Sequence, residues 1–360
     1  MAYNYRNVFC CVTCGASYKQ RSFSYIKSNM KKVSFFTFML VAILHSCKTT
    51  DGEIYQSERD NVISAKNLIK EIDLGDVALS NMAGMVDVGK YILFHDYNSM
   101  DKLMHLFEKT TYKRVASFGN AGQGPFEISN MGGATWNKNS QELLVSDMGS
   151  FQMYSYNVDS VVANPDYKPS VKMKMDPSTF PVGYFCINDT MSVCQVMIPI
   201  NNSGFDMCTG LMNLETGEIN KKPYDREDIH KRRFEIAVST KHNLYAECNL
   251  LYDLISVFDL DGTLKYNIYG PQWGETGLST GEKCLFADDY LIVAYDGTVY
   301  EEYKNANRCF VFSVTGQYIA TLQIGYNITA MCYDESNGEL IFAFDDEIQF
   351  GSLKLNDVLK

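Results

Sequence analysis

The chain has 360 residues, of which 46% are hydrophobic and 21% are charged, a composition that is typical of a globular protein and excludes a fully disordered one. Its formal net charge is −11, and the first 46 residues contain six Lys or Arg and no Asp or Glu, so the rest of the chain is more acidic still. Because nucleic-acid binding depends on Lys and Arg that neutralise phosphates, an acidic body argues against nucleic acid as a partner.

A basic and then apolar segment near the N-terminus predicts an export signal. Lys31 and Lys32 precede the apolar run of residues 33–44, which is too short to cross a bilayer of about 30 Å. A basic start, a short apolar run and a small residue before the cleavage point are typical of a secretory signal peptide. We therefore expect a signal peptide over residues 30–46, beginning at Met30, and a spurious upstream extension over residues 1–29.

The sequence Leu44-His45-Ser46-Cys47 resembles the lipobox of bacterial lipoproteins, although His45 is an unusual residue at its position. The resemblance implies that the Cys47 thiol carries a diacylglyceryl group and that Cys47 is the mature N-terminus. It also implies attachment to the bacterial cell envelope, with the membrane and its face left open. The polar residues that follow predict a flexible tether over residues 47–66.

Cysteines in the body of the chain are odd in number and show no pairing pattern: Cys186, Cys194, Cys208, Cys248, Cys284, Cys309 and Cys332. Most lie in apolar, strand-like runs, where a free cysteine behaves as a small buried hydrophobe. Export is compatible with one disulfide, but the sequence does not choose the pair. Cys11-x-x-Cys14 lies in the extension and lacks a second ligand pair, so we do not assign it to a metal.

A repeat runs through the body, where the helical period is nearly absent. Short strands that end in an apolar or aromatic residue precede Gly75, Gly119, Gly270 and Gly325. The three intervals between these successive glycines correspond to one, three and one units of about fifty residues. Within a unit, turns such as Asp261-Gly262 separate the strands, because Gly tolerates positive φ without steric cost. Four strands in such a unit are typical of a propeller blade.

The number of units predicts an all-β fold, a six-bladed β-propeller with four-stranded blades over residues 67–360. The predicted units are 76–119, 120–175, 176–225, 226–270, 271–325 and 326–360. The last unit lacks one strand, and residues 68–74 form a strand with no unit before it. We expect this N-terminal strand to pair into the last blade as its outer strand, which removes the open edge of the ring. A β-sandwich or a pair of β domains is the alternative.

A glycine-rich stretch joins the first two predicted blades and contains Gly119, Gly122, Gly124, Pro125 and Glu127. It resembles the Gly-x-x-Gly-x-Gly-Pro-Gly-Glu-Phe pattern of bacterial lipoproteins in the six-bladed NHL- and TolB-like propeller group. Phe126 replaces the usual Gly and Ile128 the usual Phe. The resemblance covers about residues 68–360 and implies the fold, but little chemistry, because the group is largely uncharacterised.

The same stretch lacks the features of a phosphate cradle, because Pro125 and Phe126 stand where a P-loop has Lys and Ser or Thr. We interpret it as a tight, structural crossing between blades in which Glu127 accepts backbone hydrogen bonds. A ligand-binding loop is the alternative.

Two carboxylates occupy equivalent positions in neighbouring units, Asp96 and Asp147, each at the end of an apolar strand. The first interpretation is capping of the following turn. The second is a ring of carboxylates at the channel mouth that binds Ca²⁺, which needs six to eight oxygen ligands. The chain has no His-x-x-x-His pair for zinc and no Gly-x-Ser-x-Gly elbow for a nucleophilic serine.

One basic cluster interrupts the acidic body: Arg226, His230, Lys231, Arg232 and Arg233. It is either a solvated loop or an anion site, for which Arg232 and Arg233 are the candidates, since arginine forks match carboxylates.

Together these features predict a lipid-anchored binding or scaffold propeller without catalysis, which attaches to the membrane through its lipid and takes a protein, peptide or glycan ligand. We assign no metal and no cofactor to it. A partner subunit of an uptake or signalling complex is a related hypothesis. The alternative from another class is a propeller hydrolase or lyase, similar to a calcium-dependent lactonase, with a carboxylate site in the channel.

Overall fold

The computed structural model describes residues 49–50, 52–201, 204–224, 226–229, 232–275, 281, 283–297 and 305–359. The predicted extension, the signal peptide and Cys47 lie outside these residues. Within the described part of the chain, no helix is long and apolar enough to span a membrane. The regular helices there are short: η1 (Lys66–Leu68), α1 (Val158–Ala163) and η3 (Leu355–Asp357).

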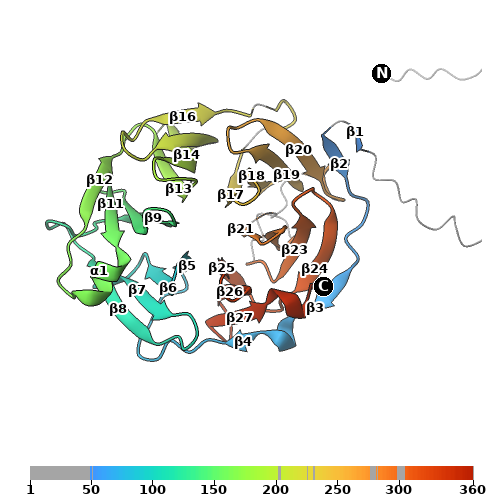
Figure 1. The fold of residues 1–360 in the computed structure, drawn as a ribbon. Helices are drawn as coiled ribbons and strands as arrows, with labels where there is room; N and C mark the ends of the chain where they lie inside the picture. The colour runs from blue at the N-terminus through green and yellow to red at the C-terminus, as the bar shows by residue number, and fades with distance from the viewer. Residues whose placement is uncertain are drawn as a thin grey trace, which may run out of the picture. The chain divides into compact units, whose positions relative to one another are not determined.

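Six antiparallel sheets follow one another around a ring (Figure 1). Blade one contains β5 (Ala83–Val88), β6 (Tyr91–Asp96), β7 (Lys102–Glu108) and β8 (Arg114–Asn120). Blade two contains β9 (Met131–Asn137), β10 (Glu142–Asp147), β11 (Gln152–Asn157) and β12 (Ser170–Lys174). Blade three contains β13 (Phe180–Cys186), β14 (Met191–Asn201), β15 (Gly204–Asn213) and β16 (Ile219–Lys222).

The second half of the ring repeats this order. Blade four contains β17 (Phe234–Ser239), β18 (Leu244–Asn249), β19 (Leu254–Asp259) and β20 (Leu264–Tyr269). Blade five contains β21 (Lys283–Ala287), β22 (Tyr290–Tyr295), β23 (Arg308–Ser313) and β24 (Tyr318–Gln323). Blade six contains β25 (Ile328–Asp334), β26 (Glu339–Phe344), β27 (Phe350–Lys354) and β4 (Lys70–Glu71). The predicted fold of six four-stranded blades is confirmed.

The core of the ring lies between the blades rather than inside any one of them. Along β22, Leu291 and Val293 pack toward blade four, whereas Ile292 and Ala294 pack toward blade six. Six apolar clusters arise in this way, each between two neighbouring blades. Because both faces of a blade are covered, its second strand reads as a continuous apolar run, as in a sheet buried on both sides.

The predicted closing strand lies beside the C-terminal strand. In β4, Lys70 is opposite Ser352 and Glu71 is opposite Gly351 of β27, and the pair is antiparallel. The Ile72 N–H extends this ladder by donating to the Phe350 carbonyl at 3.0 Å. The N-terminal segment therefore completes blade six as expected, although the strand is shorter than the seven residues 68–74.

The tether prediction for residues 47–66 needs a correction for the part that the structure describes. Three short strands, β1 (Thr49–Thr50), β2 (Glu53–Tyr55) and β3 (Val62–Ser64), lie on the outer edges of the ring. β2 runs parallel to β20 in blade four, and β3 runs parallel to β24 in blade five. The polar composition concealed these strands, because an outer edge needs backbone pairing more than apolar side chains. We call residues 52–74 the belt (Figure 1).

Arg59 fixes the belt between blades four and five. Its guanidinium lies 2.9 Å from the Asp253 carboxylate, and each side chain is only 6% exposed. The same group lies over the Phe310 ring, 4.3 Å from its centroid. A planar cation is suited to this site because it pairs with a carboxylate and stacks on a ring at once.

Lys109 joins the first and last blades. Its ammonium group is 2.7 Å from Asp334 at the end of β25 and 2.9 Å from Asp87 in β5. Burial alone would raise the pKa of Asp334, but hydrogen bonds from Lys109, Ser336 and Asn337 lower it below its ordinary value. Burial raises the pKa of Asp87. Asp334 is therefore the carboxylate that balances the lysine charge.

We predict that Lys109→Met lowers the free energy of unfolding by about 3 kcal/mol at pH 7, because it leaves two poorly hydrated carboxylates without a cation. Lys138→Met is the matched control, since Lys138 and its partner Glu335 are 72% and 63% exposed. The control should change stability by less than about 1 kcal/mol. Urea denaturation of the three proteins measures both values, and equal values for the two variants would contradict the assignment.

The stabilising effect of this ion pair should depend on pH in one direction. The folded-state pKa of Asp334 lies below its ordinary value of 3.8, so its contribution is present above that pH and is lost as the pH falls through the folded-state pKa. The difference in the free energy of unfolding between wild type and Lys109→Met, measured by urea denaturation, should therefore become smaller in acid.

Candidate functional site

Asp96 caps the end of β6. Its carboxylate accepts hydrogen bonds from the Ser80 N–H and the Ser80 hydroxyl, both at 2.7 Å, and from the Asn98 N–H at 2.9 Å. Burial would raise the pKa of Asp96, but these hydrogen bonds hold it below the ordinary value. The carboxylate thereby ties the connection that enters blade one to the turn after β6.

Asp147 does the same at the end of β10. It accepts hydrogen bonds from the Ser129 hydroxyl at 3.0 Å, the Asn130 N–H at 2.9 Å and the Gly149 N–H at 3.1 Å. The Ser150 hydroxyl donates a further bond at 2.6 Å. The geometry at both aspartates favours the capping interpretation. In the described part of the chain, no three His, Cys, Asp or Glu side chains converge as a metal site would require.

The glycine-rich stretch between blades one and two closes on itself. The Gly124 N–H donates to the Glu127 carboxylate at 2.7 Å, as expected, and Ala121 forms a parallel bridge with Ile128. Gly119 has φ +70°, and a Cβ there would lie 2.3 Å from the methyl carbon of Met104.

This stretch turns at Pro125 and Phe126. The backbone conformation of the turn explains why the propeller pattern that the stretch resembles has Gly at the position of Phe126. Phe126 adopts φ +64°, where the pattern has Gly. A side chain rarely adopts this conformation, so glycine is the less strained choice. Gly122 faces the Glu127 carboxylate as well, and a Cβ there would lie 2.0 Å from one of its oxygens. These contacts support the structural interpretation of the stretch.

The basic cluster separates in space. Arg233 points to backbone groups, donating to the Arg232 carbonyl at 2.7 Å and to the Phe205 carbonyl at 3.0 Å. Arg232 and Arg226 instead line a cavity between blades three and four. His230 and Lys231 lie outside the described residues.

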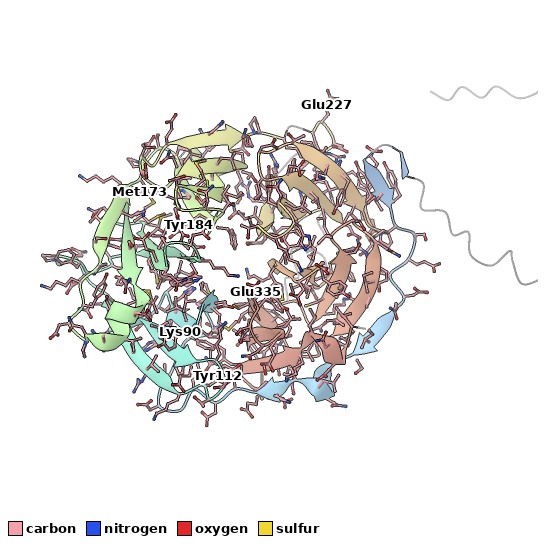
Figure 2. All side chains as sticks on the ribbon, in the orientation of Figure 1. Lys90, Tyr112, Met173, Tyr184, Glu227 and Glu335 are labelled. Atoms are coloured by element: carbon pink, nitrogen blue, oxygen red, sulfur yellow. The ribbon has the colours of Figure 1, made fainter. Side chains whose placement is uncertain are left out.

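We call this cavity the blade 3–4 pocket, and its volume is about 630 Å³. The strands of both blades and the connection between β16 and β17 line it. Figure 2 labels one lining residue, the exposed Glu227, at the outer side of the ring on that connection. The apolar part of the wall includes Ile198, Met207, Phe234 and Leu254. The charged part includes Asp206, Lys221, Arg226, Glu227, Arg232 and Glu247.

Arg232 and Glu247 form the inner polar end of the pocket. Glu247 is 5% exposed, pairs with Arg232 and accepts a hydrogen bond from the Thr209 hydroxyl at 2.6 Å. Burial raises the pKa of Glu247, and the charge and hydrogen bonds of Arg232 and Thr209 offset this only in part. The Arg232 guanidinium also lies 4.9 Å from the Phe234 ring centroid, which holds its plane against the pocket wall.

The rim of the pocket carries a different kind of cation. Lys221 in β16 is exposed, and among the described residues no carboxylate lies within ion-pair distance of it. Arg226, in contrast, is paired with Asp228 at 2.6 Å and donates to the Tyr269 hydroxyl at 3.1 Å. Among the described residues, the pocket thus offers the restrained Arg232 guanidinium inside and, at its rim, the Lys221 ammonium without a carboxylate partner.

Sequence reasoning found Arg232 but missed Glu247 and Lys221. Glu247 had a usable signal, because it is a lone acidic residue inside the strand run Leu244–Asn249. Such a residue is rarely buried without a partner. Lys221 had no such signal in the sequence, since a lysine on an outer strand is an ordinary surface residue.

No protein-family model and no curated protein matches this chain. Solved structures do match. A DUF4221 family member from Bacteroides vulgatus is 14% identical, with a TM-score of 0.53 and coverage of 79% of this chain and 95% of that chain. Regucalcin from Agrobacterium tumefaciens, a calcium-binding protein, is 9% identical, with a TM-score of 0.50 and coverage of 81% and 95%.

A third match is the β-propeller domain of Cps50 (Swd1) from Myceliophthora thermophila, which is 8% identical, with a TM-score of 0.50 and coverage of 80% of this chain and 99% of that chain. At these identities the matches support the propeller fold alone. They do not distinguish a binding propeller from an enzyme.

Proposed function

We propose that this chain is a lipid-anchored binding propeller of the bacterial cell envelope, which takes a carboxylate-bearing ligand in the blade 3–4 pocket. The observation that carries the proposal is the pairing of a restrained guanidinium with apolar walls in a cavity of about 630 Å³. Cavities of this size are typical of small-molecule sites, in which a few polar groups orient a ligand against an apolar surface.

The ligand chemistry follows from the two cations. Arginine forks match a carboxylate with two parallel hydrogen bonds, and stacking on Phe234 orients the Arg232 fork in advance. Lys221 supplies an unpaired charge at the rim, which attracts the same group from solution. Ile198, Met207 and Leu254 then contact the apolar part of the ligand. A peptide with a free C-terminus or a uronic-acid glycan presents this chemistry.

We predict that acetylated tripeptides ending in a free Leu carboxylate bind the purified protein, and that their C-terminally amidated counterparts bind at least about tenfold more weakly. Arg232→Lys keeps the charge beside Glu247 but removes the fork, and it should weaken binding by a similar factor. Lys221→Met should weaken binding without altering the fold, because Lys221 is exposed.

Arg233→Lys is the matched control, since Arg233 does not line the pocket. Titration calorimetry gives the affinities, and circular dichroism checks each fold. A hexuronate disaccharide in the same assay distinguishes a glycan from a peptide ligand. Equal affinity for acid and amide, or no binding of either probe class, would overturn the carboxylate assignment.

The anchor gives an independent prediction. The full chain expressed in a bacterium should fractionate with membranes and incorporate labelled palmitate, whereas Cys47→Ser should lose both properties. Cys194→Ser is the control, because Cys194 is buried inside blade three. A wild-type chain that carries no lipid would contradict the anchor and leave the pocket proposal standing.

The second candidate is the calcium-dependent hydrolase that the sequence left as the alternative, and the calcium-binding protein regucalcin has a similar fold. We expect the purified protein to contain less than one-tenth of an equivalent of calcium, and its melting temperature to be unchanged by calcium or by a chelator. This expectation rests on Asp96 and Asp147, whose oxygens are already hydrogen-bonded to their own turns. Stoichiometric calcium would favour the hydrolase.

A further inference from the structure

Seven cysteines of the propeller are free thiols in the structure, and two of them belong to the apolar cluster between blades four and five. These are Cys248 of β18 and Cys284 of β21. The other cysteines have different surroundings. Cys309, for example, contacts the Met331 sulfur at 3.8 Å, and Cys332 lies in the cluster between blades six and one.

The alternation of side chains places both thiols in one interface. Along β18, Ala246 and Cys248 pack toward blade five, whereas Tyr245 packs toward blade three. Along β21, Cys284 packs toward blade four, whereas Leu285 packs toward blade six. Cys248 and Cys284 therefore face the same apolar layer, one from blade four and the other from blade five.

The backbone that carries Cys284 passes close to Cys248. A Cβ built on Gly281, three residues before Cys284, would lie 3.1 Å from the Cys248 Cβ. Cys248 is also near enough to Cys284 to contribute to the raised pKa of the Cys284 thiol. The facing strands and the close approach of Gly281 to Cys248 both point to this pair.

We propose that Cys248 and Cys284 are a disulfide-forming pair that cross-links blades four and five once the protein reaches an oxidising compartment. The oxidant belongs to the class of reactive disulfides, either a thiol–disulfide oxidoreductase or oxidised glutathione. Cys284 is half-buried whereas Cys248 is fully buried, so Cys284 is the more accessible thiol and the first to react.

The exchange balances in two steps. The Cys284 thiolate attacks one sulfur of the external disulfide, whose S–S bond breaks, and the departing thiolate takes up the proton that Cys284 lost. The Cys248 thiolate then attacks the Cys284 sulfur. The second external sulfur leaves and takes up the proton from Cys248. Two protein thiols are oxidised to one disulfide, and one external disulfide is reduced to two thiols.

The surroundings of the pair also set when the bond forms. Burial, followed by the hydrogen bond to Cys248, raises the pKa of Cys284 well above its ordinary value, so little thiolate exists in the folded protein. Oxidation should therefore be slow in the native state and fast while the chain folds. The cross-link would reinforce an interface that Arg59 of the belt already spans.

The test is to refold the full chain in buffer containing oxidised and reduced glutathione, alkylate the remaining thiols, digest with trypsin and analyse the peptides without reduction. The chain offers a clear readout, since the peptides 242–265 and 284–304 each contain one cysteine, Cys248 and Cys284. We expect these two peptides to be linked in most molecules, and we expect the oxidised protein to have a higher urea midpoint than the reduced protein.

Cys248→Ser should abolish both the linked peptide and the shift in midpoint. The matched control is the double variant Cys194→Ser, Cys208→Ser, whose two sites lie diagonally on β14 and β15 of one sheet. This variant should keep the linked peptide and the shift in midpoint. Alkylation of Cys248 and Cys284 as free thiols in wild-type protein, or a link from either to another cysteine, would overturn the proposal. This readout uses wild-type protein, so it stands even if a variant fails to fold.

Discussion

The burial of two apolar faces by every sheet is the constraint on which this structure depends. Val293 faces blade four and its neighbour Ile292 faces blade six, so blade five needs a partner on each side. A row of such sheets would leave two faces in water, and a ring leaves none. The closure of the ring is therefore part of the core, and the Lys109–Asp334 pair belongs to the same requirement.

The belt stabilises the ring at its outer edge, where apolar packing ends. Its strands satisfy backbone groups of β20, β24 and β27 in turn, as Figure 1 shows. Arg59 adds a buried contact between blades four and five, through Asp253 and Phe310. The belt also reaches the pocket wall, because Tyr55 stacks on Tyr269, whose hydroxyl accepts a hydrogen bond from Arg226.

The connections between blades determine where binding chemistry is available. Around blades one and two, Asp96 and Asp147 use both of their carboxylate oxygens to bind their own turns. Between blades three and four, the connection instead covers a cavity, and Arg232 reaches Glu247 across it. The same architecture thus forms closed crossings at blades one and two and an open crossing between blades three and four, and the difference lies in a few side chains.

Local pattern was sufficient to predict the number of blades, their approximate limits and the closing strand near Lys70, because strand period and glycine turns depend on residues close in the chain. It was also sufficient for the Glu127 hydrogen bond. It failed for the belt, whose edge pairing needs few apolar residues. Tertiary structure alone decided the Arg232–Glu247 pair, the exclusion of Arg233 from the pocket, and the placement of Cys248 and Cys284 in one interface. Each depends on which faces of separate strands are brought together, and this is a property of the closed ring rather than of any segment.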